Sequence, residues 1–150
     1  MPNNVVLVDA DEQDLIDRRM VVWANTFPNI PTTITIINYT ELAADAPGMA
    51  LANIQSAVVL KRYILGGYQA EYQFELIYRI KPDGSNDKRL TADALLNTFG
   101  SWASQQRPNI GENLKVIKIE PTTRATLFAR YENGDEDHQI LLKMTYERMN

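Results

Sequence analysis

The chain has 150 residues, of which 45% are apolar and 23% charged, and its formal net charge is −4. This length and apolar content are typical of one globular domain, so we expect a single domain over residues 1–150. The absence of cysteine excludes disulfides, a thiolate nucleophile and a cysteine-based zinc site, and the acidic balance argues against a surface for nucleic-acid backbones.

The N-terminal part predicts an arm, a helix and a strand. Residues 1–10 carry no clear periodicity and are expected to form a flexible or extended arm. Apolar side chains then recur at helical spacing behind a group of acids, which predicts a helix over Asp11–Asn25 (Ile16, Met20, Trp23 and Phe27). The prolines that follow end this helix, because they lack a backbone donor. The β-branched residues of Thr32–Tyr39 predict a strand.

A long β-hairpin is the clearest predicted element. Even-numbered positions are mostly apolar over Ala50–Leu65, and they are apolar or aromatic over Ala70–Ile80, where the odd-numbered positions are mostly polar. This period of two on both sides of Gly66-Gly67 predicts two long strands joined by a two-residue turn. Each arm would then hold about twelve residues and measure about 40 Å.

The C-terminal half predicts a second helix over Asp87–Ser104 and then three strands, at Leu114–Ile119, Arg124–Tyr131 and Gln139–Tyr146. Asn133-Gly134 is a typical turn between the last two strands. The order of the elements predicts an α+β fold. We expect an antiparallel or mixed sheet, containing the long hairpin, that packs against two main helices.

The candidate catalytic and metal-binding residues are few. The one histidine, His138, ends the acidic run 132–138, which could be a metal-binding loop or a solvated hairpin loop. Consecutive ligands do not converge on an ion, so the solvated loop is favoured. Glu71 and Glu75 would need a flanking cleft to act as a carboxylate pair, and a solvated or subunit-facing row is the favoured interpretation. We therefore predict no catalytic residue, no metal site and no cofactor, and a protein that is not an enzyme.

The length of the hairpin predicts partners. The helix Asp87–Ser104 would be about 27 Å long, which is shorter than an arm of about 40 Å. Unless the first helix or a strand bend covers the rest, apolar side chains near the tip lack cover within the chain, and such a patch marks an interaction site. No apolar run approaches the ~20 residues of a membrane span, so no membrane partner is expected. We predict self-association through the hairpin, with an interface that includes Leu60, Arg62, Ile64, Tyr68, Glu71, Tyr72, Gln73 and Glu75.

Two segments carry a family resemblance, LKRYILGGYQAEYQFELIYRIKP at Leu60–Pro82 and SNDKRLTADALLNTFGSWA at Ser85–Ala103. They resemble the minor capsid proteins of tailed bacteriophages of Gram-positive hosts. The stretches FPNIP from Phe27 and DAPGMA from Asp45 fit the same pattern, so the resemblance spans roughly Phe27–Ala103. Within that group the chain looks like a tail-terminator or tail-completion protein.

The resemblance implies a tail-terminator-like fold and a structural virion subunit, whose hexameric ring ends the tail tube and joins it to the head. Its partners would be other copies of the chain, tail-tube and head-connector proteins, with DNA only as passing cargo. It would reside in the virion, at the tail or head–tail junction, and in the host cytoplasm during assembly. The acidic balance would suit a wall that does not hold DNA.

Two alternatives to the tail terminator stay open. One is another head–tail connector or stopper protein, which would assemble by the same logic in a different layer. The other is a small-ligand-binding module, which a deep apolar pocket between the helices and the sheet would favour.

Overall fold

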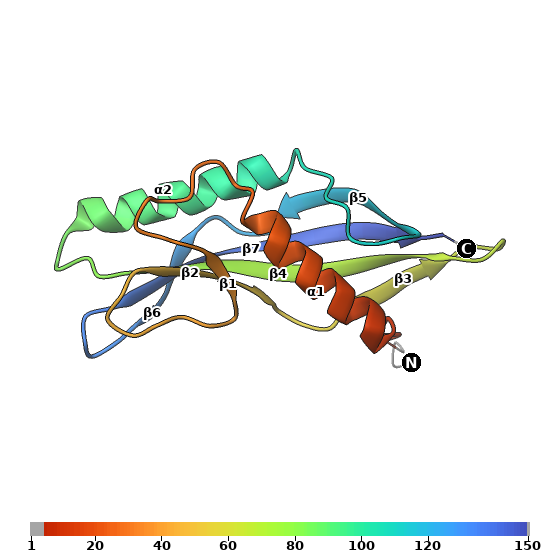
Figure 1. Cartoon of the computed structure of the whole chain (residues 1–150), viewed down its shortest axis with the longest axis horizontal. Coiled ribbons are helices and arrows are strands. Elements are labelled where there is room, and N and C mark those ends of the chain that lie inside the picture. The colour runs from red at the N-terminus through yellow and green to blue at the C-terminus, as the bar shows by residue number, and fades with distance from the viewer. Residues whose placement is uncertain (1–4, 150) are drawn as a thin grey trace.

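The computed structural model describes residues 5–149, which form two helices and one seven-stranded mixed sheet (Figure 1). The predicted α+β fold class is therefore confirmed. In chain order the elements are α1 (Ala10–Ala24), β1 (Ile37–Tyr39), β2 (Gly48–Asn53), β3 (Val58–Arg62), β4 (Tyr68–Ile80), α2 (Asn86–Ala103), β5 (Leu114–Pro121), β6 (Thr126–Arg130) and β7 (Glu136–Arg148).

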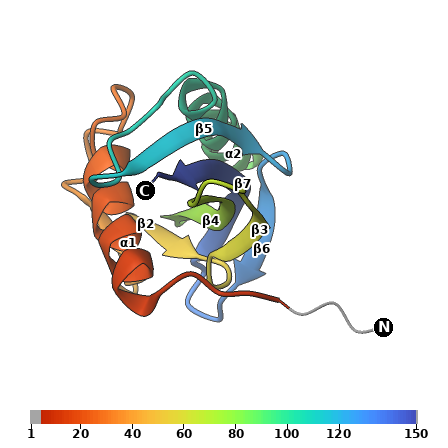
Figure 2. The same cartoon turned by 90° about the vertical axis from the view of Figure 1, so that its right-hand side faces the viewer.

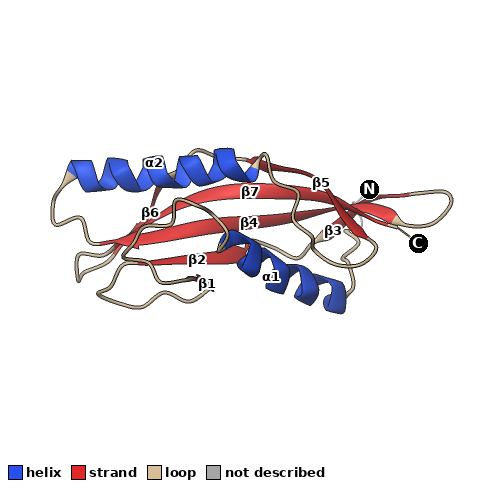
Figure 3. Cartoon of the chain, turned by 45° about the horizontal axis from the view of Figure 1, so that its top comes forward, coloured by secondary structure: helices blue, strands red, loops and turns tan. Residues whose placement is uncertain are grey.

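Two long antiparallel strands, β4 and β7, form the centre of the sheet and run side by side along the molecule (Figure 3). Their register has no irregularity from the pair Tyr68↔Arg148 to the pair Ile80↔Glu136. The outer edge of β4 pairs with β2 and β3, and the outer edge of β7 pairs with β6 and β5. The short strand β1 adds to β2 in parallel.

Both helices cover the same face of this sheet, the face that carries the even-numbered residues of β4 and β7. Trp23 of α1 packs edge-on against Phe74 with 6.1 Å between ring centroids. On α2, a Cβ added at Gly100 would lie 2.8 Å from the Ile140 side chain, so glycine permits the close approach of this helix to β7. Seen end-on, α1 and α2 lie over different parts of the twisted sheet (Figure 2).

The other face carries the odd-numbered residues of the two central strands, and we call it the open face. The hydrophobic core contains even-numbered residues of β4 and β7, such as Tyr72 and Leu142, and none of the odd-numbered ones in the described part of the chain. The side chains of the open face are mostly polar and half-buried, because neighbouring strands shield them but no helix packs on them. This amphipathic alternation is typical of a sheet covered on one side.

The first arm of the predicted hairpin is divided. Instead of one continuous strand over Ala50–Leu65, β2 and β3 both pair with β4 and are separated by residues 54–57. At the break the Gln13 side chain of α1 accepts a hydrogen bond from the backbone of Ala57 at 2.6 Å. The division also changes which side chains face the helices. Met49 and Leu51 point to the core, whereas the even-numbered Ala50 and Ala52 lie on the open face.

Other boundaries differ near the first helix. Of the predicted strand Thr32–Tyr39 only Ile37–Tyr39 is a strand, and the Asn25 amide exchanges two hydrogen bonds with the Ile37 backbone at 2.8 and 3.0 Å. The predicted arm is extended at residues 5–8, where Val6 accepts a backbone hydrogen bond from Val59. Residues 1–4 of that arm lie outside the described residues. Within residues 5–149 no helix is long and apolar enough to cross a membrane.

Candidate assembly surface

The turn between β3 and β4 presents two apolar side chains at its apex. Tyr63 and Gly67 close the turn, because the Tyr63 N–H donates to the Gly67 carbonyl at 3.1 Å and the Gly66 N–H donates to the Tyr63 carbonyl at 3.2 Å. The apex residues are therefore Ile64 and Leu65, which are 102% and 94% exposed. The turn lies where Gly66-Gly67 predicted it, but it is a three-residue loop with an apolar apex and not a two-residue glycine turn.

The base of this turn is held firmly against β7. Gly67 has a φ of 81°, and a Cβ at this position would clash with the carbonyl oxygen of Arg148. Only glycine tolerates both conditions without strain. Tyr63 adds a hydrogen bond from its hydroxyl to Glu147 Oε2 at 3.0 Å. The exposed apex thus projects from a fixed base.

A buried carboxylate, Glu12, joins α1 to the same end of the sheet. It accepts hydrogen bonds from the hydroxyls of Tyr68 at 2.6 Å and Tyr146 at 2.7 Å, and from Arg148 Nη1 at 2.8 Å. Burial and then the hydrogen bond to Glu12 raise the pKa of Tyr146, so its hydroxyl remains a neutral donor. The sequence showed Glu12 only as one acid of a helix start.

The structure separates the predicted interface residues into three places. Leu60, Arg62 and Ile64 lie on β3 and at the turn, and all three are exposed. Tyr68 and Tyr72 lie on the helix-covered face of β4. The remaining three residues lie on its open face (Glu71, Gln73 and Glu75).

Tyr72 is fully buried, and its hydroxyl donates to Asp17 of α1 at 2.6 Å. Tyr72 is therefore covered within the chain. The first helix covers this end of the sheet, which is one of the two possibilities that the sequence left open. Tyr68, four positions away on the same strand, is half-buried, and its hydroxyl donates to Glu12 of the same helix.

Glu71 and Gln73 belong to a polar row that crosses the open face. Gln73 Nε2 donates to Glu71 at 2.8 Å, and Lys143 of β7 lies 3.7 Å from Glu71 and 3.4 Å from Glu120 of β5. Lys118 then lies 3.6 Å from Glu120. Each charge in this row has a partner of opposite sign within the chain, and Lys143 makes the pairs that cross between strands.

Glu75 is different from its neighbours on the open face. It is half-buried and lies opposite Ala52 on one side and Leu141 on the other. Its carboxylate makes no hydrogen bond or ion pair with residues 5–149. Burial raises the pKa of the Glu75 carboxyl.

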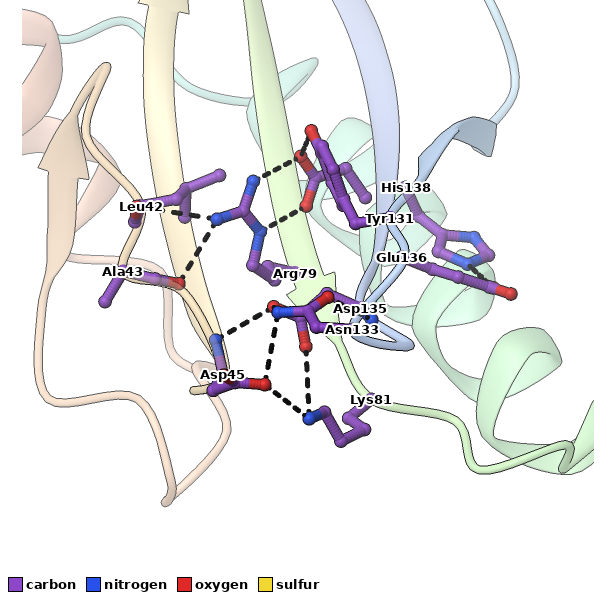
Figure 4. A network of polar contacts seen from close by, with 11 residues as sticks. Leu42, Ala43, Asp45, Arg79, Lys81, Tyr131, Asn133, Asp135, Glu136 and His138 are labelled. Atoms are coloured by element: carbon purple, nitrogen blue, oxygen red, sulfur yellow. Dashed lines mark hydrogen bonds and ion pairs between the residues drawn. The ribbon is translucent and has the colours of Figure 1, made fainter.

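The second half of the acidic run, residues 135–138, is buried, whereas residues 132–134 form an exposed turn. The interpretation of the whole run as a solvated loop is therefore corrected for its second half. Asp135 and Asp137 are each 2% exposed and His138 is equally covered. Arg79 donates two hydrogen bonds to Asp137 at 2.7 and 2.8 Å, and the Tyr131 hydroxyl donates a third to the same carboxylate at 2.8 Å (Figure 4). The carboxylate can be buried because Arg79, its cationic partner, lies directly opposite Asp137 in the pairing of β4 with β7.

Glu136 is the second buried carboxylate of this cluster. It accepts hydrogen bonds from Arg89 and Arg130 at 3.0 Å and lies 3.1 Å from His138 Nε2, while His138 Nδ1 lies 2.7 Å from Asp93 of α2. Burial alone would raise the pKa of Glu136, but the hydrogen bonds from these neighbours outweigh it and hold the pKa at about 2. Within residues 5–149 no three His, Cys, Asp or Glu side chains are arranged to hold a metal ion.

The space between helices and sheet is filled by stacked aromatic rings. Trp23 and Trp102 are parallel with 5.1 Å between centroids, and Phe27 and Phe99 pack around them. A cavity of about 370 Å³ between α2 and the β5–β6 connection has a mixed polar and apolar lining of Asn97, Ser101, Pro121, Thr122, Thr123, Arg124 and Ile140. It is not the deep apolar pocket that would favour a ligand-binding module.

Comparison with known proteins gives a structural match without a sequence match. No family model matches the chain, and no curated protein does. A chain from the virion of a native gene transfer agent particle superposes with a TM-score of 0.54 over 93% of this chain and 87% of that one, at 11% identity. A second solved chain, 19% identical, gives a TM-score of 0.39 over 92% of this chain and 96% of that one, which is too low to indicate a common fold. The chain therefore shares its fold with a protein from the gene transfer agent virion.

Proposed function

We propose that this chain is a structural subunit of a phage-like virion, of the tail-terminator or tail-completion type. Copies of it assemble into a ring, hexameric in the family that it resembles, which ends the tail tube and joins it to the head. The observation that carries the proposal is the fold shared with a gene transfer agent virion chain along 93% of this chain. The sequence resemblance over Phe27–Ala103 supports the same class of protein from separate evidence.

The distribution of polar groups supports an assembly role over a catalytic one. The buried carboxylates Glu12, Glu136 and Asp137 have their acceptor atoms occupied by arginine and tyrosine donors of the same chain. Carboxylates that are hydrogen-bonded in this way hold the helices and strands together, and they are poorly suited to transfer protons to or from a substrate. The exposed apex of Ile64 and Leu65 has the opposite character, because fully exposed apolar side chains gain free energy from a partner that covers them.

The test is electron microscopy of the purified protein, alone and with growing tail tubes, beside tubes without the protein as the control. We expect rings at tube ends and tubes that stop lengthening once the protein is added. Tubes that lengthen as in the control would overturn the terminator role. Rings that bind a head connector but never a tube would also overturn it, and would assign the protein to another layer of the head–tail junction.

A further inference from the structure

The tip of the β3–β4 hairpin combines exposed apolar groups with positive groups that make no ion pair with residues 5–149. Behind the apex of Ile64 and Leu65 stand Lys61 and Arg62, both exposed. Their charged groups lie over aromatic rings, with Lys61 Nζ 5.8 Å from the Tyr63 centroid and Arg62 Cζ 5.7 Å from that of Tyr68. Neither makes an ion pair with a carboxylate in the described part of the chain. We call these four residues, Lys61, Arg62, Ile64 and Leu65, the tip patch.

The open face offers a site of complementary character around Glu75. On the same face lie the half-buried apolar side chains of Ile77 and Leu141. The carboxylate of Glu75 has no donor among residues 5–149, and on β7 the Gln139 Oε1 atom is buried without a hydrogen-bond partner. A half-buried carboxylate without a cation is unfavourable, and a cation brought to it recovers the lost free energy. We call Glu75, Ile77 and Leu141 the face patch.

The two patches cannot meet within one chain. Glu75 lies on β4 seven positions beyond Tyr68, where the turn ends, which places it about 23 Å along a strand that does not bend back. The base of the turn is fixed by Gly67 and by the hydrogen bond between Tyr63 and Glu147. A tip patch can therefore reach a face patch only on another copy of the chain.

We propose that neighbouring subunits join head to tail, with the tip patch of one copy docked on the face patch of the next. Ile64 and Leu65 then cover Ile77 and Leu141, and Lys61 or Arg62 pairs with Glu75. This inference rests on the proposed ring and gives that ring its subunit contact.

A contact between two different surfaces leaves one tip patch and one face patch free at the ends of every chain of subunits. Repetition of such a heterologous contact closes into a ring when the rotation between subunits allows it. The contact also divides the predicted interface residues into two complementary sets, Arg62 and Ile64 on one subunit and Glu75 on the next.

The test uses two variants of the full chain that each lose one patch. The tip variant carries Ile64→Ser and Leu65→Ser, and the face variant carries Glu75→Arg. Their masses are measured by light scattering, alone and mixed in equal amounts, with unmodified chain as reference. We expect each variant alone to be a monomer and the mixture to stop at dimers, because one intact tip patch meets one intact face patch and no further contact can form.

Two controls separate the contact from a fault in folding. Val22→Ser removes another exposed apolar side chain, 68% exposed on α1 and outside both patches, and should leave assembly unchanged. Glu75→Gln keeps the size of the side chain and loses only the charge. It should raise the concentration needed for half-assembly at least tenfold, while the Tm of the single chain stays the same or rises, because the uncompensated charge is removed.

The outcomes distinguish this contact from the proposed function. Variants that assemble like the unmodified chain would overturn the contact and leave the ring standing. A mixture that assembles no further than either variant alone would also overturn it. Unmodified chains that stay single at every concentration, with and without tail tubes, would overturn the contact and the proposed function together.

Discussion

Replacing Glu12 with glutamine tests how the first helix is attached to the sheet. Glutamine keeps the shape of the side chain but turns one acceptor oxygen into a donor that faces other donors. One buried tyrosine hydroxyl then loses its acceptor, at a cost of about 1–3 kcal/mol, and the remaining hydrogen bonds lose their ionic component, about 1 kcal/mol in all. Arg148 is 43% exposed, so its ion pair adds little. We expect a loss of about 3 kcal/mol in the free energy of unfolding.

Urea unfolding at pH 7, followed by far-ultraviolet circular dichroism, measures this loss. The matched control is Asp11→Asn, which removes a neighbouring charge from the same helical turn at an exposed position. That control should cost at most about 0.5 kcal/mol through the helix dipole. Combining Glu12→Gln with Tyr146→Phe should cost less than the sum of the two single losses, because both remove the same hydrogen bond. A loss for Glu12→Gln no larger than that of Asp11→Asn would refute the reasoning.

Two further predictions concern stability. Gly67→Ala should lower the free energy of unfolding by about 2 kcal/mol or more, because alanine adds a clash with the Arg148 carbonyl to the strain of a positive φ. Gly84 has a φ of 79° with open space around it, so Gly84→Ala measures the backbone strain without a clash and should lower the free energy of unfolding by less. Equal losses for the two variants would contradict a contribution from the clash. The pKa of Glu136 is lowered from 4.5 to about 2, so its contribution to stability is complete above pH 4.5 and is lost as the pH falls towards 2. Glu136→Gln should therefore be less stable than the unmodified chain at pH 7, and the gap should narrow between pH 4.5 and 2; a constant gap would show that the group does not titrate there.

Local periodicity predicted the elements that bury one face continuously. The alternation over Ala70–Ile80 corresponds to β4, and the helical spacing around Ile16 and Leu96 corresponds to α1 and α2, because in each element the pattern is set by residues close in sequence. The break between β2 and β3 could not be predicted in the same way. It depends on Gln13, which lies 44 positions from its partner Ala57.

In the candidate surface too, only the features that depend on residues close in sequence could be predicted. The turn at Gly66-Gly67 was correctly located, and the exposed Arg62 and Ile64 follow from that position. The burial of Asp137 was missed, because it requires the register that sets Arg79 opposite, 58 positions away. A pairing of strands so distant along the chain leaves no local sign in the sequence.

The ladder between β4 and β7 also determines the order in which this chain can fold. Every pair in it joins residues 56 to 80 positions apart, so the entropy of closing a long loop is lost before any of its hydrogen bonds form. Folding is therefore slow compared with that of a helical bundle of similar size. During synthesis, β4 is complete long before β7, and until residue 136 emerges one whole edge of the central strand has no partner. A chain interrupted before that residue keeps this edge open to pairing with other chains, and its expected fate is aggregation.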